Sequence, residues 1–93
     1  MSSILELIHS NDVRHFYAGE VIIEQGAKSN LLWFLVKGAV EIVKDGVCLA
    51  TAAQPGAVFG ELSALLGGNH TATVRALRPC VFRVVDNPRA FLE

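Results

Sequence analysis

The sequence predicts an all-β domain, a double-stranded β-helix or jelly-roll-like β-roll with short flanking helices. Glycines recur at intervals of 7, 12, 8 and 10 residues, at Gly19, Gly26, Gly38, Gly46 and Gly56. Short runs of β-branched and aromatic residues fill the spaces between them. Regular turn residues that separate short apolar runs are typical of a β-sandwich or barrel.

The expected strands are the apolar runs between these turns, at 13–17, 21–25, 31–37, 39–44, 47–52, 71–77 and 80–85. Asp45-Gly46 favours a two-residue type I′ hairpin between two of them. The 71–77 run alternates, with Ala72, Val74 and Ala76 on one side, and predicts a half-buried strand. The expected core residues are Trp33, Phe34, Leu35, Val40, Ile42, Val74 and Phe82.

Three short helices are expected around these strands. The first lies within 2–9, where Ser2 and Ser3 can cap a helix that runs through His9. The second spans 61–66, between Gly60 and the glycine pair 67–68, which would stop it. A third would begin at Pro88, since proline suits the first turn of a helix.

Composition narrows the possible functions of this single domain, 1–93. With 8 basic and 9 acidic residues, the net charge is −1, which disfavours direct nucleic-acid binding by this segment. No apolar run is long enough to span a membrane, and residues 1–10 lack a signal peptide's basic start. Cys48 and Cys80 lie in apolar runs and are expected to be buried, reduced thiols, with a disulfide or metal site as the alternatives. We therefore expect a cytoplasmic protein with no membrane contact.

The segment 54–74, QPGAVFGELSALLGGNHTATV, carries the chemistry. Gly60 precedes the expected helix, whose first unpaired N–H groups would favour an anion. Glu61 beside an anion fits a ligand that also offers hydroxyl groups, such as a ribose. The alternative is a plain helix start, because an acidic first turn is favourable without any ligand.

Four motifs in order resemble the cyclic-nucleotide-binding domain family, whose members include catabolite activator proteins and regulatory subunits of cyclic-AMP-dependent kinase. They are FYAGEVIIEQG at 16–26, LVKGAVEI at 35–42, PGAVFGELSAL at 55–65 and TATVRA at 71–76. The resemblance covers about residues 12–93 and looks nearest to stand-alone bacterial members. It implies a β-roll that holds its ligand in a phosphate-binding cassette, with C-terminal lid helices that we expect to be absent from this chain.

The resemblance implies that Gly60 and the following amides meet the cyclic phosphate and that Glu61 accepts from the ribose 2′-hydroxyl. The family's phosphate-binding arginine, nine residues after the glutamate, falls on His70. Losing one charge-assisted contact costs roughly 1.5–3 kcal/mol, and the alternative role for His70 is an exposed loop residue. The expected ligand-binding residues are Val58, Phe59, Gly60, Glu61, Leu62, Ser63, His70, Thr71 and Ala72.

We therefore expect a regulatory domain that binds cyclic AMP or cyclic GMP and needs no cofactor. Its expected protein partner is an effector domain or a second copy of itself in a homo-oligomer. The alternative is a degenerate module of the same fold that acts by protein contacts or binds another small anion. An enzyme on a similar barrel, such as a cupin, needs clustered metal ligands. His9, His15 and His70 have no such spacing, and no nucleophile motif occurs, so we expect no catalytic activity.

Overall fold

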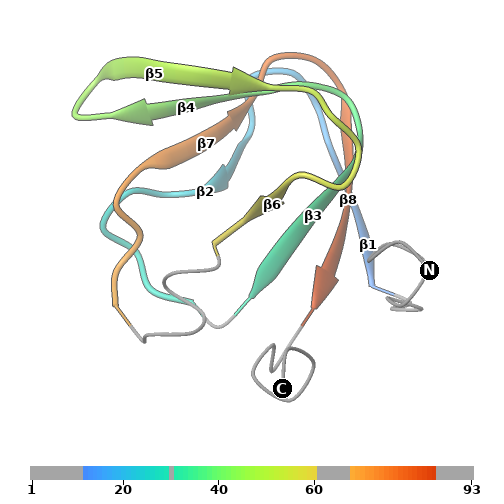
Figure 1. Ribbon diagram of the computed structural model, residues 1–93, viewed down its shortest axis with the longest axis horizontal. Coiled ribbons are helices and arrows are strands. Elements are labelled where there is room, and N and C mark those ends of the chain that lie inside the picture. The colour runs from blue at the N-terminus through green and yellow to red at the C-terminus, as the bar shows by residue number, and fades with distance from the viewer. Residues whose placement is uncertain (1–11, 30, 61–67, 86–93) are drawn as a thin grey trace.

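The chain forms a β-roll of eight strands in the computed structural model, which describes residues 12–29, 31–60 and 68–85 (Figure 1). The strands are β1 (Val13–Phe16), β2 (Val21–Ile23), β3 (Leu32–Lys37), β4 (Val40–Lys44), β5 (Val47–Ala52), β6 (Val58–Phe59), β7 (Thr73–Ala76) and β8 (Cys80–Val85). No helix occurs in these described ranges, so none there could span a membrane. The expected helices at 2–9, at 61–66 and from Pro88 lie outside the described residues.

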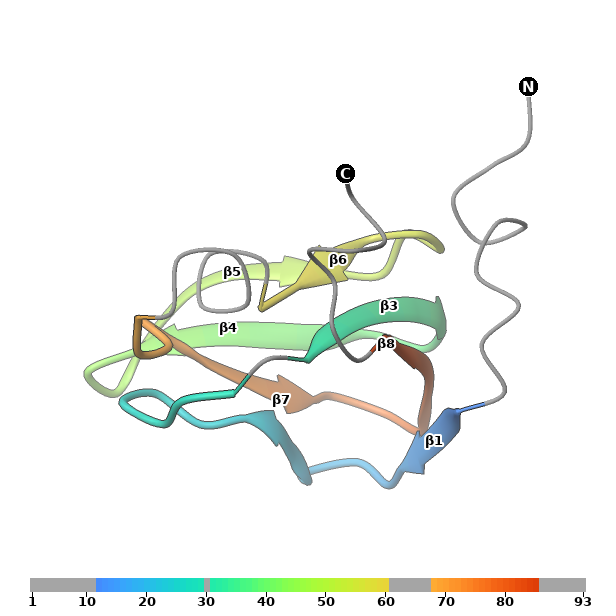
Figure 2. The same ribbon diagram turned by 90° about the horizontal axis from the view of Figure 1, so that it is seen from below.

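Two four-stranded antiparallel sheets make up the roll. One has the order β1-β8-β3-β6 and the other β2-β7-β4-β5 (Figures 1 and 2). The chain crosses repeatedly from one sheet to the other, so strands distant in sequence become neighbours. The expected all-β class is confirmed, and the strands at 47–52 and 80–85 have the predicted bounds.

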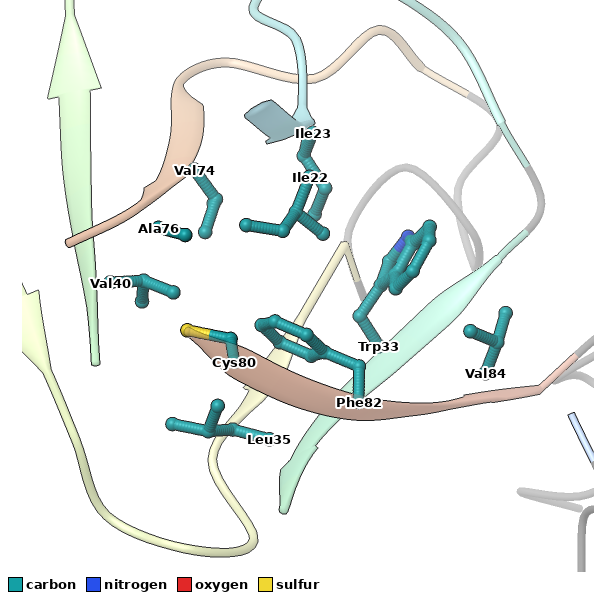
Figure 3. Close-up of a cluster of buried hydrophobic side chains, with 10 residues drawn as sticks. All are labelled: Ile22, Ile23, Trp33, Leu35, Val40, Val74, Ala76, Cys80, Phe82 and Val84. Atoms are coloured by element: carbon teal, nitrogen blue, oxygen red, sulfur yellow. The ribbon is translucent and has the colours of Figure 1, made fainter. Parts of the chain in front are cut away.

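The core lies between the sheets. Phe82 on β8 meets the rings of Phe16, Trp33 and Phe59 edge-on, with centroids 5.7, 5.9 and 6.2 Å apart. Aliphatic side chains from the other sheet complete the cluster (Figure 3). Of the expected core residues, only Ile42 is partly rather than fully buried, and Phe34 packs in a second cluster with Leu32.

The hairpin between β4 and β5 forms as predicted. Asp45 and Gly46 have φ angles of +50° and +81°, as a type I′ turn requires. The Gln25 side chain holds this turn from the β2–β3 connection. Its Nε2 donates to Asp45 Oδ1 at 2.7 Å, and its Oε1 accepts from the Asp45 N–H at 2.9 Å.

Two expectations about the outer strands of the sheets, β5 and β6, are wrong. Cys80 is buried as expected, but Cys48 is exposed, because β5 is the outer strand of its sheet and only Ala52 in it is even partly buried. Both cysteines are free. The short strand β6 was not expected as a strand; it pairs with β3 through Trp33 and Phe34 and so places the segment before Gly60 against the core.

Candidate functional site

Those residues expected to bind a ligand that the structure describes come together on one pocket of about 210 Å³, hereafter the site pocket. Six of the nine line it, namely Val58, Phe59, Gly60, His70, Thr71 and Ala72. The other three, Glu61, Leu62 and Ser63, lie outside the described residues. The two contributing segments are brought together because β6 pairs with β3 while β7 pairs with β2 and β4.

Gly60 directly follows β6 and has the positive φ that glycine adopts readily. Its φ is +85°, and a Cβ there would lie 2.9 Å from the Leu31 carbonyl oxygen and 3.5 Å from His70 Cε1. Contacts under 3.0 Å essentially never occur for a real Cβ. The backbone of Gly60 therefore forms part of the pocket wall at a place where a side chain would have to displace its neighbours.

His70 lines the same pocket, and two backbone hydrogen bonds hold it in place. Its backbone N–H donates to the Ala27 carbonyl at 2.7 Å, and its own carbonyl accepts from the Gly26 N–H at 2.8 Å. Its Nε2 lies 3.3 Å from Ser29 Oγ. Only 9% of the residue is exposed, so the alternative of an exposed loop residue is wrong. A histidine in such a place is a wall residue of the pocket.

The sequence did not reveal four further wall residues, Ile23, Ile42, Asn69 and Val74. Three of them are strand residues that look like ordinary core in the sequence. The fourth is Asn69, whose side-chain amide donates to the Gly26 carbonyl at 3.0 Å. These contacts join segments more than 40 residues apart, which no local pattern records.

The wall of the site pocket carries little charge. Its described residues include no Lys, Arg, Asp or Glu, and His70 is their one titratable side chain. Burial lowers the pKa of His70 below its ordinary value, because desolvation disfavours the imidazolium. Within the described ranges, no cluster of His, Cys, Asp and Glu could hold a metal ion. The arrangement suits a ligand bound by backbone amides, one imidazole and apolar contacts.

Thr71 and Ala72 follow His70 on the approach to β7. Thr71 is exposed and Ala72 is half-buried. Thr73, two residues on, accepts the Gln25 N–H with its Oγ1 at 3.0 Å. The segment from Asn69 to Thr73 is thereby tied along its length to the connection between β2 and β3.

A family model described as cyclic nucleotide-binding domain matches residues 13–92. A cAMP-dependent protein kinase regulatory subunit from Yarrowia lipolytica is 41% identical over 69 residues, 74% of this chain and 18% of that protein. Glutaminase 2 from Bradyrhizobium diazoefficiens is 38% identical over 91 residues, 97% of this chain and 13% of that protein. This chain thus spans a fifth or less of these curated relatives.

Solved structures agree on the fold. A structure described as cAMP-bound PfPKA-R superposes with a TM-score of 0.79 at 27% identity, over 87% of this chain and 28% of that one. The catabolite activator protein of Thermus thermophilus gives 0.77 at 24% identity, over 87% and 40% respectively, and supports the fold alone. The match of the family model to residues 13–92 shows that this chain belongs to the cyclic nucleotide-binding domain family.

Proposed function

We propose that this domain binds a cyclic nucleotide, cyclic AMP or cyclic GMP, in the site pocket and regulates an effector through that binding. The observation that carries the proposal is the meeting of Gly60 with the 70–72 segment on one pocket. These are the positions at which the family resemblance places the phosphate-binding cassette. The pocket, at about 210 Å³, is smaller than the roughly 300–1,000 Å³ of common ligand sites.

Three residues take distinct roles in this proposal. The Gly60 backbone approaches the cyclic phosphate closely, since no Cβ intervenes. The Glu61 carboxylate accepts from the ribose 2′-hydroxyl, as the resemblance implies. His70 replaces the family's arginine and offers the phosphate one ring N–H, whereas a guanidinium offers a charged fork. Affinity is therefore expected to be weaker than with an arginine in that place.

Calorimetric titration with cyclic AMP and cyclic GMP tests the proposal, with linear 5′-AMP as the control. We expect both cyclic nucleotides to bind, with a preference of less than about tenfold, because one Thr71 hydroxyl contact contributes about 0.5–1.5 kcal/mol net. A hundredfold preference would mean that another group reads the base. Absence of binding by either cyclic nucleotide at millimolar concentration would contradict the proposal.

A second candidate is a degenerate module that binds another small anion or acts by protein contacts. The absence of Lys and Arg from the described wall of the site pocket favours it. Titration with inorganic phosphate separates the two candidates. Binding of phosphate as tight as that of the cyclic nucleotides would favour a simple anion site, since the nucleoside part would then contribute nothing.

We propose that the domain itself is regulatory rather than catalytic and that it works in the cytoplasm. The relatives' names support regulation: one is a cAMP-dependent kinase regulatory subunit and another a cGMP-dependent protein kinase from Caenorhabditis briggsae, 29% identical over 83 residues. The relatives come from fungal, bacterial and animal sources, so the stand-alone bacterial type stays a prediction. The partner, an effector domain or a second copy in a homo-oligomer, also stays a prediction.

A further inference from the structure

His70 lies between two pockets. It lines the site pocket and also an adjacent pocket of about 290 Å³, whose wall includes Ser29, Glu24 and Trp33. Ser29 belongs only to the adjacent pocket. The imidazole therefore has a hydroxyl neighbour on one side and the proposed ligand cavity on the other.

The Ser29 hydroxyl contacts one of the two ring nitrogens of His70. Its Oγ lies 3.3 Å from His70 Nε2, and the same oxygen accepts the Leu31 N–H at 3.3 Å. A hydroxyl can donate to the Nε2 of a neutral imidazole and can accept from the Nε2–H of an imidazolium. Ser29 can thus hold the ring in one orientation in both protonation states. Nδ1 makes no hydrogen bond within the part of the chain that the structure describes.

Few charges bear on this ring. The described wall of the site pocket carries no other titratable group, and the adjacent pocket carries one carboxylate, that of the exposed Glu24. Glu61 follows Gly60 in sequence and lies outside the described residues. Burial keeps the pKa of His70 below its ordinary value of ~6.5, which favours the neutral imidazole at pH 7. An anion placed against the ring would favour the imidazolium and raise that pKa.

We propose that Ser29 is a positioning residue that binds His70 Nε2 and leaves Nδ1–H for the ligand phosphate, so that cyclic-nucleotide binding takes up a proton on His70. The inference rests on the function proposed above. The proton comes from the solvent and ends on the imidazole, and no covalent bond is made or broken in the nucleotide. Because the imidazolium donates more strongly to a phosphate than the neutral ring does, affinity rises as pH falls.

Titrations of cyclic AMP in two buffers of different ionisation enthalpy, at several values between about pH 5.5 and pH 8 around the ordinary histidine pKa of ~6.5, measure this uptake directly. We expect uptake of a fraction of one proton and an affinity that falls with rising pH, by at most about tenfold per unit. Glu61→Gln should retain the proton uptake, which separates His70 from the carboxylate as the site of protonation. His70→Gln should abolish it.

Ser29→Ala tests the positioning role against Ser29→Thr, which keeps the hydroxyl. We expect Ser29→Ala to weaken binding by about 3- to 10-fold, since a neutral hydrogen bond contributes about 0.5–1.5 kcal/mol, and to shift the midpoint of the pH profile and the His70 pKa measured by NMR. Ser29→Thr should restore both. A purely structural role would weaken binding equally at every pH and leave the His70 pKa in place, and that result would overturn the positioning role.

The outcomes separate this inference from the proposed function. Binding of cyclic AMP with no proton uptake at any pH would overturn the inference and leave the function standing. No binding of either nucleotide at any pH would overturn both.

Discussion

His70 would be an uncommon residue for the wall of the proposed anion site, because it is buried and burial lowers the pKa of its imidazole. Backbone hydrogen bonds to Gly26 and Ala27 fix where its side chain begins. The ring then contacts Ser29 and lies near the Gly60 backbone. At this scale, the family resemblance places His70, a group whose charge depends on pH, where the family has a permanently charged arginine.

Restoring the family's residue with His70→Arg should tighten cyclic-nucleotide binding by roughly 10- to 100-fold, because a guanidinium adds a charge-assisted contact worth about 1.5–3 kcal/mol. Without ligand, the same change should lower thermal stability, since a buried charge without a partner is costly. His15→Arg is the matched control on exposed β1 and should change neither quantity. Calorimetry and thermal melts with and without nucleotide measure both effects, and an unchanged affinity would show that position 70 does not contact the phosphate.

The lowered pKa of His70 also predicts how stability depends on pH. Burial disfavours the imidazolium in the folded state, so the unfolded chain binds more protons than the folded one around pH 6. The contribution is fully present above the ordinary histidine pKa of ~6.5 and is lost as pH falls from there toward the folded value. Without ligand, the wild type should lose more stability between pH 7 and pH 5 than His70→Gln does. Parallel urea midpoints for the two proteins would contradict this.

At the scale of elements, the backbone directly after β6 is constrained at Gly60 by its positive φ and by its close neighbours. Gly60 and Gly46 have nearly the same positive φ, +85° and +81°. They differ in their surroundings, since a Cβ at Gly60 would meet the Leu31 carbonyl while one at Gly46 would meet nothing within 4 Å. The two positions therefore allow backbone strain to be separated from steric contact.

Gly60→Ala and Gly46→Ala should both destabilise the fold by about 1–2 kcal/mol through the unfavourable φ. Gly60→Ala should cost more, because the Leu31 carbonyl has to move, and it alone should weaken nucleotide binding. Urea unfolding and calorimetry on both variants measure the difference. Equal stability losses together with intact binding would show that the wall adapts to a methyl group.

The strands themselves differ sharply in what their leucines contribute. Leu35 on β3 is 0% exposed, whereas Leu49 on the outer strand β5 is 59% exposed. Leu35→Ala should therefore cost about 2–5 kcal/mol, and Leu49→Ala should stay within about 0.5 kcal/mol. Denaturant midpoints give both values. A large loss for Leu49→Ala would mean that β5 is covered in solution.

At the scale of the whole molecule, the glycine spacing predicted the fold class and most strands because each turn leaves a local signal. The failures arose where burial depends on sheet position. Cys48 lies in an apolar run, yet β5 has a neighbour on one side only. The strand β6 has two residues, too few to show an alternating pattern of apolar and polar residues in the sequence. Its pairing with β3 joins segments that are distant in the sequence.

The site was only partly predictable for the same reason. Gly60 and His70 could be placed because they stand in a motif with fixed spacing. Ser29 is 41 residues from His70 in the sequence, in a connection with no motif of its own, so nothing local marked it. The burial of His70 likewise follows from hydrogen bonds to the β2–β3 connection and not from its neighbours in the chain.

The pairing of β1 with β8 has a consequence for how such a roll is carried within larger proteins. The two strands are antiparallel neighbours, with Val13 opposite Arg83. The chain therefore enters and leaves the roll at one corner of one sheet. A host polypeptide can accept this unit between two of its own segments while those segments stay a strand's width apart, about 5 Å. Such geometry favours insertion of this domain into other proteins by gene fusion, whatever reaction the host protein catalyses.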